Sequence, residues 1–504
     1  MGDDVYRYRL VKNITVLFGK QIGYTSIIYY LLLIACVIAY YLIPRRHRWT
    51  VLLTTSAIFY SWLFQTSLQI IVFITSIILS WGCGLVISKH TKKTWLAISI
   101  IISALPLFIS DGCKLINSAG MIAGYEVNNL HKLIIPIGLS FYTLQIIAYL
   151  SDIYRGKIEP ESNLLKYALF ISFFPQLIQG PIPRYKDLQH QLTGGNNYDS
   201  KNIKRAFQLI LWGFFLKFMI ADKAAVVVST VFNSWQNYSG GYYLVAGILY
   251  SIQLYTDFYA CTSLSQGAAK LFGINLSQNF NHPYFSTSVK DFWRRWHISL
   301  SYWLRDYIYI PLGGNRKGKI RKYLNLLITF SISGLWHGGS VKFLFWGLLH
   351  AIYQVVGSLT VKNRDRIYLI LGMNEHSRFK HFLRVLGTSF FIMLGWIVFR
   401  ADRLQTGLSM IGSIFTDFNP WIFSGIYLFN LGLGQNEWIV LLLSILLLCF
   451  VSRKQERRVD VGREISSANI IARYTFYIAT IVTILIFGTY GYGFDSQDFI
   501  YGGF

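Results

Sequence analysis

The sequence predicts an all-α polytopic membrane protein, and two observations carry this prediction. Apolar residues make up 53% of the 504 residues, whereas charged residues make up only 14%, well below the roughly one quarter that is usual in soluble domains. The apolar residues also gather in runs that approach the roughly 20 residues a helix needs to cross a bilayer. A disordered chain is excluded, because such a chain has few apolar and many charged residues.

The first part of the chain contains five apolar runs separated by short loops. Short loops rich in Lys and Arg stay in the cytoplasm, and Arg45, Arg46 and Arg48 follow the first run directly. The N-terminus is therefore expected outside, within an amphipathic interfacial segment over residues 1–23. The predicted spans are residues 24–43, 50–64, 68–87, 94–109 and 133–150, with residues 110–129 as an outer loop.

The middle of the chain is less regular. Residues 164–182 contain Pro175, Gly180 and Pro181 and have cations on both sides, so we expect a re-entrant segment buried in protein or beside a cavity. The remaining predicted spans are residues 206–220, 241–260, 324–335, 341–359, 385–398, 438–451 and 475–490.

These runs form a single predicted membrane domain over residues 24–490. Because residues 324–335 are short for a span, we expect about 11 transmembrane helices, plus or minus about two. The loop charges place both termini outside, whereas an odd number of spans would place them on opposite sides. Residues 491–504 form the expected extracytoplasmic tail.

The chain is strongly basic, with 47 Lys and Arg against 23 Asp and Glu and a net charge of +24. Membrane topology alone explains most of this excess of positive charge. Attraction to anionic lipid or to a phosphorylated cofactor is an additional explanation that the charge does not require. The five cysteines include no Cys-x-x-Cys pair, so neither a zinc site nor a disulfide framework is predicted. No His-Glu-x-x-His motif occurs, and no metal is expected.

The first candidate site segment is residues 291–306, where charge and aromatic side chains are densest. On one continuous helix, Arg294, His297, Ser301 and Arg305 share a face, because residues three or four positions apart lie above one another. We expect an interfacial helix whose His297 faces a cavity. The alternative is a surface helix whose polar face meets only lipid headgroups.

The second candidate segment places Trp336 and His337 inside an apolar run, next to Gly338 and Gly339. An ionisable residue at membrane depth is a functional-site hypothesis, and a histidine can act as a general base on a hydroxyl group. The alternative is a core histidine satisfied by hydrogen bonds. His350 lies thirteen residues further on, where packing or support of the site is the expected role.

Two further groups of charged residues are candidates. Asp257 lies in an apolar run and must be paired or protonated; it either orients a histidine or an arginine of residues 291–306 or forms a structural ion pair. The loop that begins at Gly313 nearly fits a phosphate-binding P-loop, but Ile320 stands where a hydroxyl is required, so a nucleotide triphosphatase is rejected. Its cations can still meet the phosphates of coenzyme A; they are Arg316, Lys317 and Lys319.

At these residues the chain resembles the membrane-bound O-acyltransferase family, and most closely its bacterial branch of alginate and peptidoglycan O-acetyltransferases. The motifs that carry the resemblance are residues 136–142, 174–185, 279–284, 291–301, 305–315 and 334–338.

The resemblance implies a helical fold around a central tunnel. Acyl-coenzyme A enters this tunnel from the cytoplasm, and the acceptor enters it from outside. Acetyl is the expected acyl group. It implies that His337 is catalytic and His297 its companion, with the tunnel supported by Asp257, Arg294, Arg305 and Trp336. It also implies an extracytoplasmic esterase-like transferase as partner. Residues 256–265 depart from the family pattern and lack its second acid, which leaves the acceptor open.

The tail ends in a Phe-x-Tyr-x-x-Phe pattern formed by Phe499, Tyr501 and Phe504. In related surface-polymer acylation systems, such a tyrosine is thought to relay the acyl group, so Tyr501 is a candidate relay. The alternative is an aromatic anchor at the membrane interface.

The expected function is transfer of an acetyl group from cytoplasmic acetyl-coenzyme A across the bacterial plasma membrane, for O-acetylation of a cell-surface polysaccharide. One alternative is D-alanyl transfer to teichoic acid. Another is a transporter that uses polar residues and broken spans near the midplane. The third alternative is a scaffold that only recruits a partner enzyme.

Overall fold

The computed structural model describes residues 23–122, 136–177, 179–374, 376–424 and 426–490. Every regular element in these ranges is helical, which confirms the all-α class. The predictions for residues 1–22 and for the tail at residues 491–504, Tyr501 included, lie outside the described residues.

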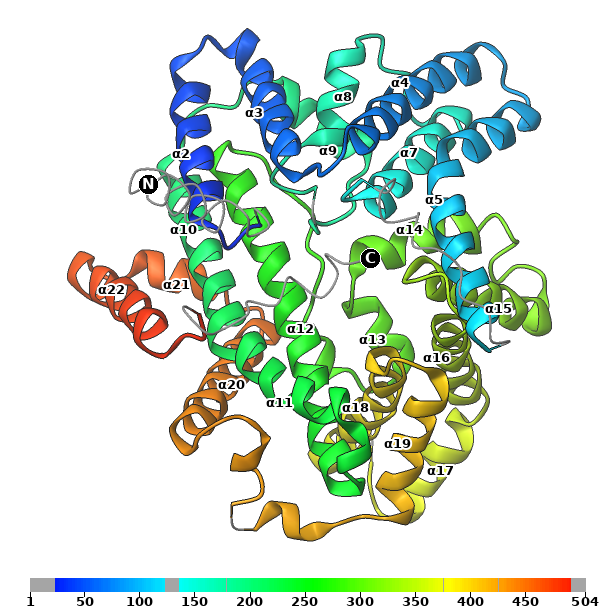
Figure 1. Ribbon diagram of the computed structural model, residues 1–504, viewed down its shortest axis with the longest axis vertical. Helices are drawn as coiled ribbons and strands as arrows, with labels where there is room; N and C mark the ends of the chain where they lie inside the picture. The colour runs from blue at the N-terminus through cyan, green and yellow to red at the C-terminus, as the bar shows by residue number, and fades with distance from the viewer. Residues whose placement is uncertain (1–22, 123–135, 178, 375, 425, 491–504) are drawn as a thin grey trace, which may run out of the picture.

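The first helices form the upper part of the molecule (Figure 1) and follow the predicted spans closely. α4 and α5 both contact α7, and α3 contacts α8. The bounds are α2 Ile27–Leu42, α3 Arg48–Leu63, α4 Ser67–Lys89, α5 Lys93–Ile122, α7 Leu139–Tyr154, α8 Leu164–Ser172 and α9 Tyr185–Thr193.

The predicted outer loop at residues 110–129 is wrong in its first half, because α5 remains helical as far as Ile122. The only proline inside this helix is Pro106, and none follows it before Ile122. A helix satisfies its backbone hydrogen bonds internally, so it does not need to end where the apolar run ends.

A long helix, α12, runs through the centre of the molecule (Figure 1). It has 32 residues and contacts α10, α11, α18 and α19. The elements beside and before it are α10 Ser200–Phe214, the π-helical segment η2 Phe215–Ala221, α11 Asp222–Asn233 and α12 Gly240–Leu271.

The remaining helices lie mostly in the middle and lower parts of the molecule (Figure 1). They are α13 Val289–Arg295, α14 Ile298–Leu304, the π-helical segment η5 Arg305–Tyr309, α15 Gly318–Trp336, α16 Val341–Leu359, α17 Val361–Ile370, α18 Arg378–Arg400, α19 Leu404–Thr416, α20 Gln435–Glu456, α21 Val461–Ser467 and α22 Ile470–Phe487.

Four described helices are long and apolar enough to cross a membrane, namely α4, α18, α20 and α22. The pair α16 and α17, bent by 57°, would make a fifth. Large apolar side chains on these helices point outward, such as Leu446 and Ile478, as lipid-facing positions require. The chain is therefore a membrane protein, and the number of about 11 spans stays a prediction.

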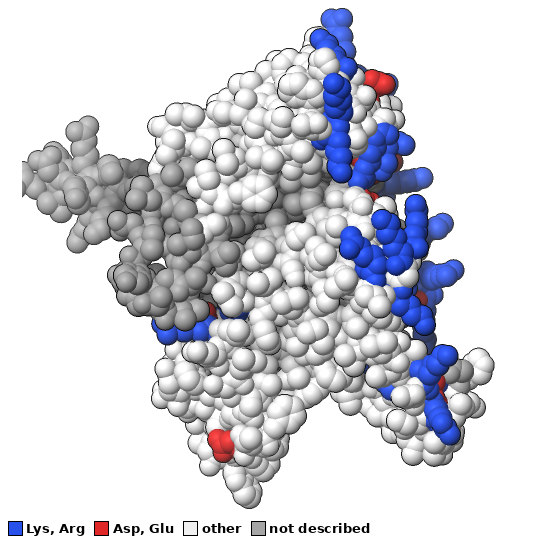
Figure 2. All heavy atoms as spheres, turned by 90° about the vertical axis from the view of Figure 1, so that its right-hand side faces the viewer, with Lys and Arg blue, Asp and Glu red and all other residues white. Residues whose placement is uncertain are grey.

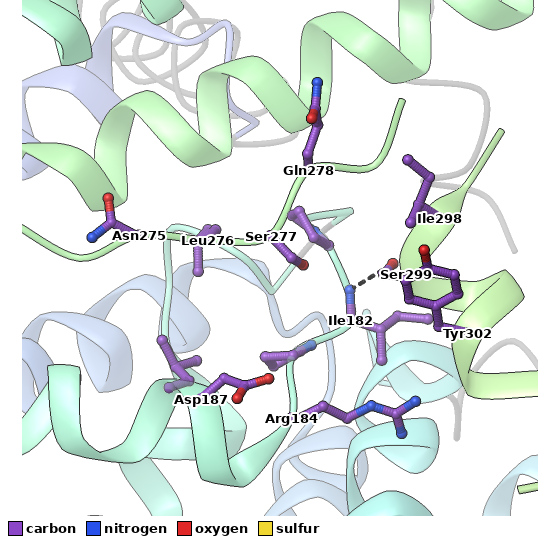
Figure 3. A pocket seen from close by; sticks show the side chains of 13 residues that line it. Ile182, Arg184, Asp187, Asn275, Leu276, Ser277, Gln278, Ile298, Ser299 and Tyr302 are labelled. Atoms are coloured by element: carbon purple, nitrogen blue, oxygen red, sulfur yellow. Dashed lines mark hydrogen bonds between the residues drawn. The ribbon is translucent and has the colours of Figure 1, made fainter. Parts of the chain in front are cut away.

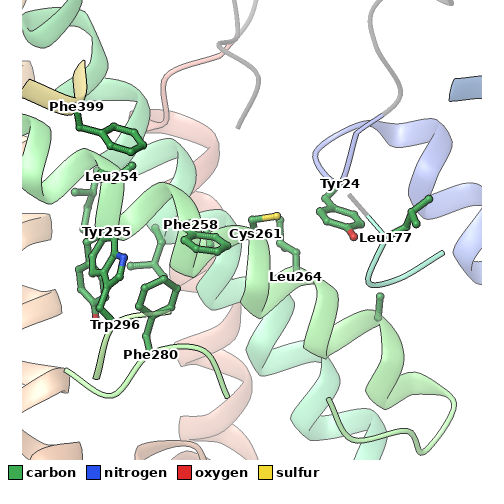
Figure 4. Packing of buried hydrophobic residues seen from close by; sticks show 14 of the residues in the cluster. Tyr24, Leu177, Leu254, Tyr255, Phe258, Cys261, Leu264, Phe280, Trp296 and Phe399 are labelled. Atoms are coloured by element: carbon green, nitrogen blue, oxygen red, sulfur yellow. The ribbon is translucent and has the colours of Figure 1, made fainter. Parts of the chain in front are cut away.

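Aromatic side chains fill the interior next to α12. Figure 4 shows Tyr255 and Phe258 on this helix beside Phe280 and Trp296. The ring centroids of Phe280 and Trp296 lie 5.2 Å apart, and those of Phe258 and Phe280 lie 5.1 Å apart. Edge-to-face pairs of this kind add stability beyond the area they bury, so this cluster holds residues 280–297 firmly against α12.

The hairpin of α15 and α16 is held by contact between two backbones. A Cβ atom at Gly334 would overlap the carbonyl oxygen of Phe343, and one at Gly347 would overlap the carbonyl oxygen of Phe330. Small residues allow membrane helices to approach this closely. The tip of the hairpin therefore has a defined position, and residues 337–340 occupy it.

Gly347→Ala should destabilise the protein, because the added methyl group must push α16 away from α15. Overpacking of this kind costs about 1–3 kcal/mol. Gly357→Ala is the matched control on the same helix, since nothing lies within 4 Å of a Cβ there, and better helix propensity should add up to about 1 kcal/mol. Thermal unfolding in detergent measures both; equal melting temperatures would contradict the close contact.

Candidate active site

His337 lies at the tip of the α15–α16 hairpin. It is the C-terminal capping residue of α15, and its backbone N–H donates to the carbonyl oxygen of Gly334 over 3.0 Å. The side chain is only 3% exposed. Its ring centroid lies 4.9 Å from that of Trp336, 5.1 Å from that of Trp346 and 5.4 Å from that of Phe399. The imidazole is thus held between aromatic rings from three helices.

His297 lies at a break between two helices, so the predicted single helix over residues 291–306 is wrong. α13 ends at Arg295 and α14 begins at Ile298, and His297 adopts a left-handed φ of 45°. The physical reason is competition from residues 279–281. Asn279 accepts from the backbone N–H of Ile298, and its side-chain oxygen accepts from both the N–H and the hydroxyl of Ser299.

The break brings His297 into the interior instead of onto the shared face expected for Arg294 and Arg305. The side chain of His297 is 1% exposed. Its ring centroid lies 4.8 Å from that of Phe258 on α12 and 6.1 Å from that of Trp336. His297 and His337 therefore flank the same indole ring, which places the two predicted histidines and Trp336 in one cluster.

A cavity of about 300 Å³ opens beside the segment that carries His297. Figure 3 shows Ile298, Ser299 and Tyr302 of α14 on one side of it and residues 275–278 on another. Residues 181–184 line it as well, and the backbone N–H of Ile182 donates to the Ser299 hydroxyl over 3.0 Å. The Pro-containing segment that ends at residue 182 was expected either inside protein or beside a cavity, and its last residues do line this one. The contributions of residues 275–278 and of Tyr302 were not expected.

Asp257 pairs with a residue that the sequence analysis did not select. Lys217 Nζ lies 2.8 Å from Asp257 Oδ1 and 3.0 Å from Asp222 Oδ1, and all three side chains are buried. The alternative of a structural ion pair therefore fits these contacts. The position of Lys217 inside the predicted span at residues 206–220 was the sequence signal for this pairing, because a buried lysine needs an acidic partner. Lys217 sits in the π-helical segment η2, a geometry that often marks functional sites.

The predicted arginines lie at the surface. Arg294 is exposed. The hydrogen bond that Arg305 Nε donates to Asp306 Oδ1 over 2.8 Å raises the pKa of the Arg305 guanidinium above its usual value. The same guanidinium lies over the ring of Tyr302, which lines the cavity.

The three candidate phosphate-binding cations are exposed at and beside the turn that precedes α15; they are Arg316, Lys317 and Lys319.

His350 is buried further along α16. Its ring centroid lies 4.9 Å from that of Trp346 and 5.1 Å from that of Trp293. Gly395 of α18 makes room for it, because a Cβ atom there would overlap its Nε2 atom. His350 therefore packs against Trp346, the ring that also contacts His337.

Comparison with known proteins decides the family. The model of the membrane-bound O-acyltransferase family matches residues 158–369. The probable alginate O-acetylase AlgI of Pseudomonas syringae pv. tomato is 34% identical over 391 residues, which cover 76% of this chain and 72% of that protein. The chain belongs to the membrane-bound O-acyltransferase family.

Two further relatives place this O-acyltransferase within the family. The peptidoglycan O-acetyltransferase of Helicobacter pylori is 36% identical over 348 residues, 64% of each chain. The teichoic acid D-alanyltransferase of Bacillus subtilis is 28% identical over 314 residues, 60% of this chain and 76% of that protein. The resemblance to the acetylating branch is thus confirmed.

The family supports transfer of an acyl group to a hydroxyl, and its reaction needs a donor. Across the described ranges, no three His, Cys, Asp or Glu side chains are arranged to hold a metal ion. The candidate site in the structure is the cluster of His337, Trp336 and His297, with the cavity beside it.

Lys217→Met should destabilise the O-acyltransferase strongly, because it leaves Asp222 and Asp257 buried without their shared cation. Breaking a buried pair costs about 3–5 kcal/mol. Replacing both carboxylates by Asn in the same chain should restore most of the loss. Denaturant unfolding in detergent measures the free energy.

The matched control is Arg205→Met, whose ion pair with Asp460 is exposed and is worth at most about 1 kcal/mol. A Lys217→Met protein as stable as this control would contradict a structural role for the buried triad.

Proposed function

We propose that this O-acyltransferase takes an acetyl group from cytoplasmic acetyl-coenzyme A and transfers it across the bacterial cell membrane, for O-acetylation of a cell-surface polysaccharide. The single observation that carries the proposal is the burial of His337 at the hairpin tip, beside Trp336 and His297. The alginate O-acetylase and the peptidoglycan O-acetyltransferase compared above are 34% and 36% identical, and the D-alanyltransferase is 28% identical, which favours acetyl over D-alanyl.

The charge distribution supports an orientation in the membrane. Figure 2 shows Lys and Arg gathered along one edge of the molecule, with few on the remainder of this view. Because cytoplasmic faces carry the excess of Lys and Arg, we assign that edge to the cytoplasm. In this proposal residues 24–490 form one membrane domain and both termini are extracytoplasmic.

The cavity beside His297 is our candidate for the donor side. It is lined by Arg184 and by polar groups such as Ser299 and Asn275, and Arg305 lies over the ring of Tyr302 at its wall. A thioester with a phosphorylated carrier needs both a neutral channel and cations for its phosphates. A second group of cations lies at and beside the turn that precedes α15; they are Arg316, Lys317 and Lys319.

The reaction assigned to the site uses His337 as general base. Its imidazole removes the proton from the acceptor hydroxyl, and the hydroxyl oxygen attacks the thioester carbonyl carbon. The carbon–sulfur bond breaks, and the leaving thiolate of coenzyme A accepts the proton that His337 took from the acceptor hydroxyl. Aromatic rings around His337 exclude water, which protects the thioester from hydrolysis and holds the reactants in place. His297 positions or polarises the thioester carbonyl.

The immediate acceptor in this proposal is the hydroxyl of Tyr501 in the tail, which then passes the acetyl group to an extracytoplasmic esterase-like transferase. The support is the Phe-x-Tyr-x-x-Phe pattern of residues 499–504. A tyrosine hydroxyl suits such a relay, because its aryl ester is more reactive than the ester of a sugar hydroxyl. The partner completes the transfer to the polysaccharide.

His337→Ala should reduce release of free coenzyme A from acetyl-coenzyme A by about 10²–10⁴-fold, the usual contribution of a general base. The assay uses purified protein in lipid discs with the partner added, and a thiol reagent follows the release. His376→Ala, an exposed histidine, is the control and should keep full activity. Full activity of His337→Ala in a folded protein would overturn the catalytic assignment.

Tyr501→Phe should abolish radiolabel on the protein after incubation with acetyl-labelled coenzyme A, because it removes the only oxygen of that side chain. Tyr492→Phe changes another tail tyrosine and should leave the label in place. Mass spectrometry locates the acetyl group. Label on Tyr501 that also requires His337 supports the relay, whereas label unchanged in Tyr501→Phe contradicts it. Substrate flux without any thioester cleavage would favour a transporter instead.

A further inference from the structure

Three aromatic side chains enclose His337, and we call Trp336, Trp346 and Phe399 the aromatic box. Their ring planes make angles of 67°, 89° and 80° with the imidazole. In such edge-to-face contacts, the edge of one ring meets the face of another. Trp346 and Phe399 are fully or almost fully buried, so bulk water does not weaken the contacts of these two rings with His337.

In the proposed reaction, the aromatic box would stabilise a positive charge on His337. When His337 takes the proton of the acceptor hydroxyl, it becomes a cation in an apolar interior, where an isolated charge is costly. The face of an indole ring attracts a cation within about 6 Å, and the attraction is largest for Trp and where water is excluded. All three rings of the box lie within that distance of the imidazole centroid.

Trp346 is also held by rings outside the box. Its ring centroid lies 4.9 Å from that of His350 and 5.7 Å from that of the stacked Trp396 ring. His350 in turn fills the space above Gly395. This packing restricts rotation of the Trp346 ring, so the ring is oriented before the charge forms. Preorganised groups of this kind stabilise a transition state without reorganisation at the moment of reaction.

We propose that Trp346 is a positioning residue that stabilises the imidazolium of His337 through its indole face, with His350 holding Trp346 in place. The inference rests on the proposed function, since it concerns the charge that His337 acquires as general base. It assigns to Trp346 a role in turnover that a packing residue lacks, because the interaction appears only once the proton has moved.

The test is site-specific replacement of Trp346 by 5-fluoro-, 5,7-difluoro- and 5,6,7-trifluorotryptophan. Fluorine withdraws charge from the ring face and changes its size little. We expect kcat to fall stepwise along the series, by about tenfold at the trifluoro residue. KM for acetyl-coenzyme A and the melting temperature should stay constant, because the donor binds before the charge forms.

Trp293 is the matched control. It belongs to the same cluster, with its centroid 5.7 Å from that of Trp346 and 5.1 Å from that of His350. The same series at this position should leave kcat unchanged. A flat kcat series at Trp346, or an equal decline at both positions, would overturn the proposal. Absence of acetyl transfer in the parent protein would instead reject the proposed function itself.

Discussion

The contact between Gly334 and Gly347 is the constraint on which the site depends. It brings the backbones of α15 and α16 together, and lipid offers no hydrophobic force that could replace such close packing. Because the two helices cannot slide past each other at this contact, His337 at the end of α15 meets Trp346 on α16. α18 then closes the cluster by presenting Phe399 to His337 and Gly395 to His350.

The second half of the site is built by polar groups that replace regular helix bonds. Residues 279–281 bind the backbone on both sides of His297, so the chain can leave the helix without exposing unpaired groups in an apolar region. The buried triad of Lys217, Asp222 and Asp257 pairs side chains of opposite charge at the π-helical segment η2. In both places, buried polar groups have partners within the protein.

Sequence reasoning predicted the order of most apolar helices, because runs of apolar residues and the cations that follow them are local signals. It also selected His297 and His337, whose presence in aromatic and apolar surroundings is visible without a structure. It did not find the break at His297, since the competing bonds come from Asn279, which is distant in the chain. The partner of Asp257 was missed for the same reason: Lys217 lies forty residues away. Pairing across space leaves no periodic pattern.

The left-handed backbone at His297 means that alanine and asparagine are not equivalent replacements there. A residue with a Cβ atom pays about 1–2 kcal/mol in that conformation, and asparagine enters it more readily than alanine. Loss of activity after His297→Ala would therefore combine a side-chain effect with a shift of the backbone that carries Ser299 and the cavity wall. His337, whose φ is −73°, has an ordinary helical conformation, so alanine can replace it without backbone strain.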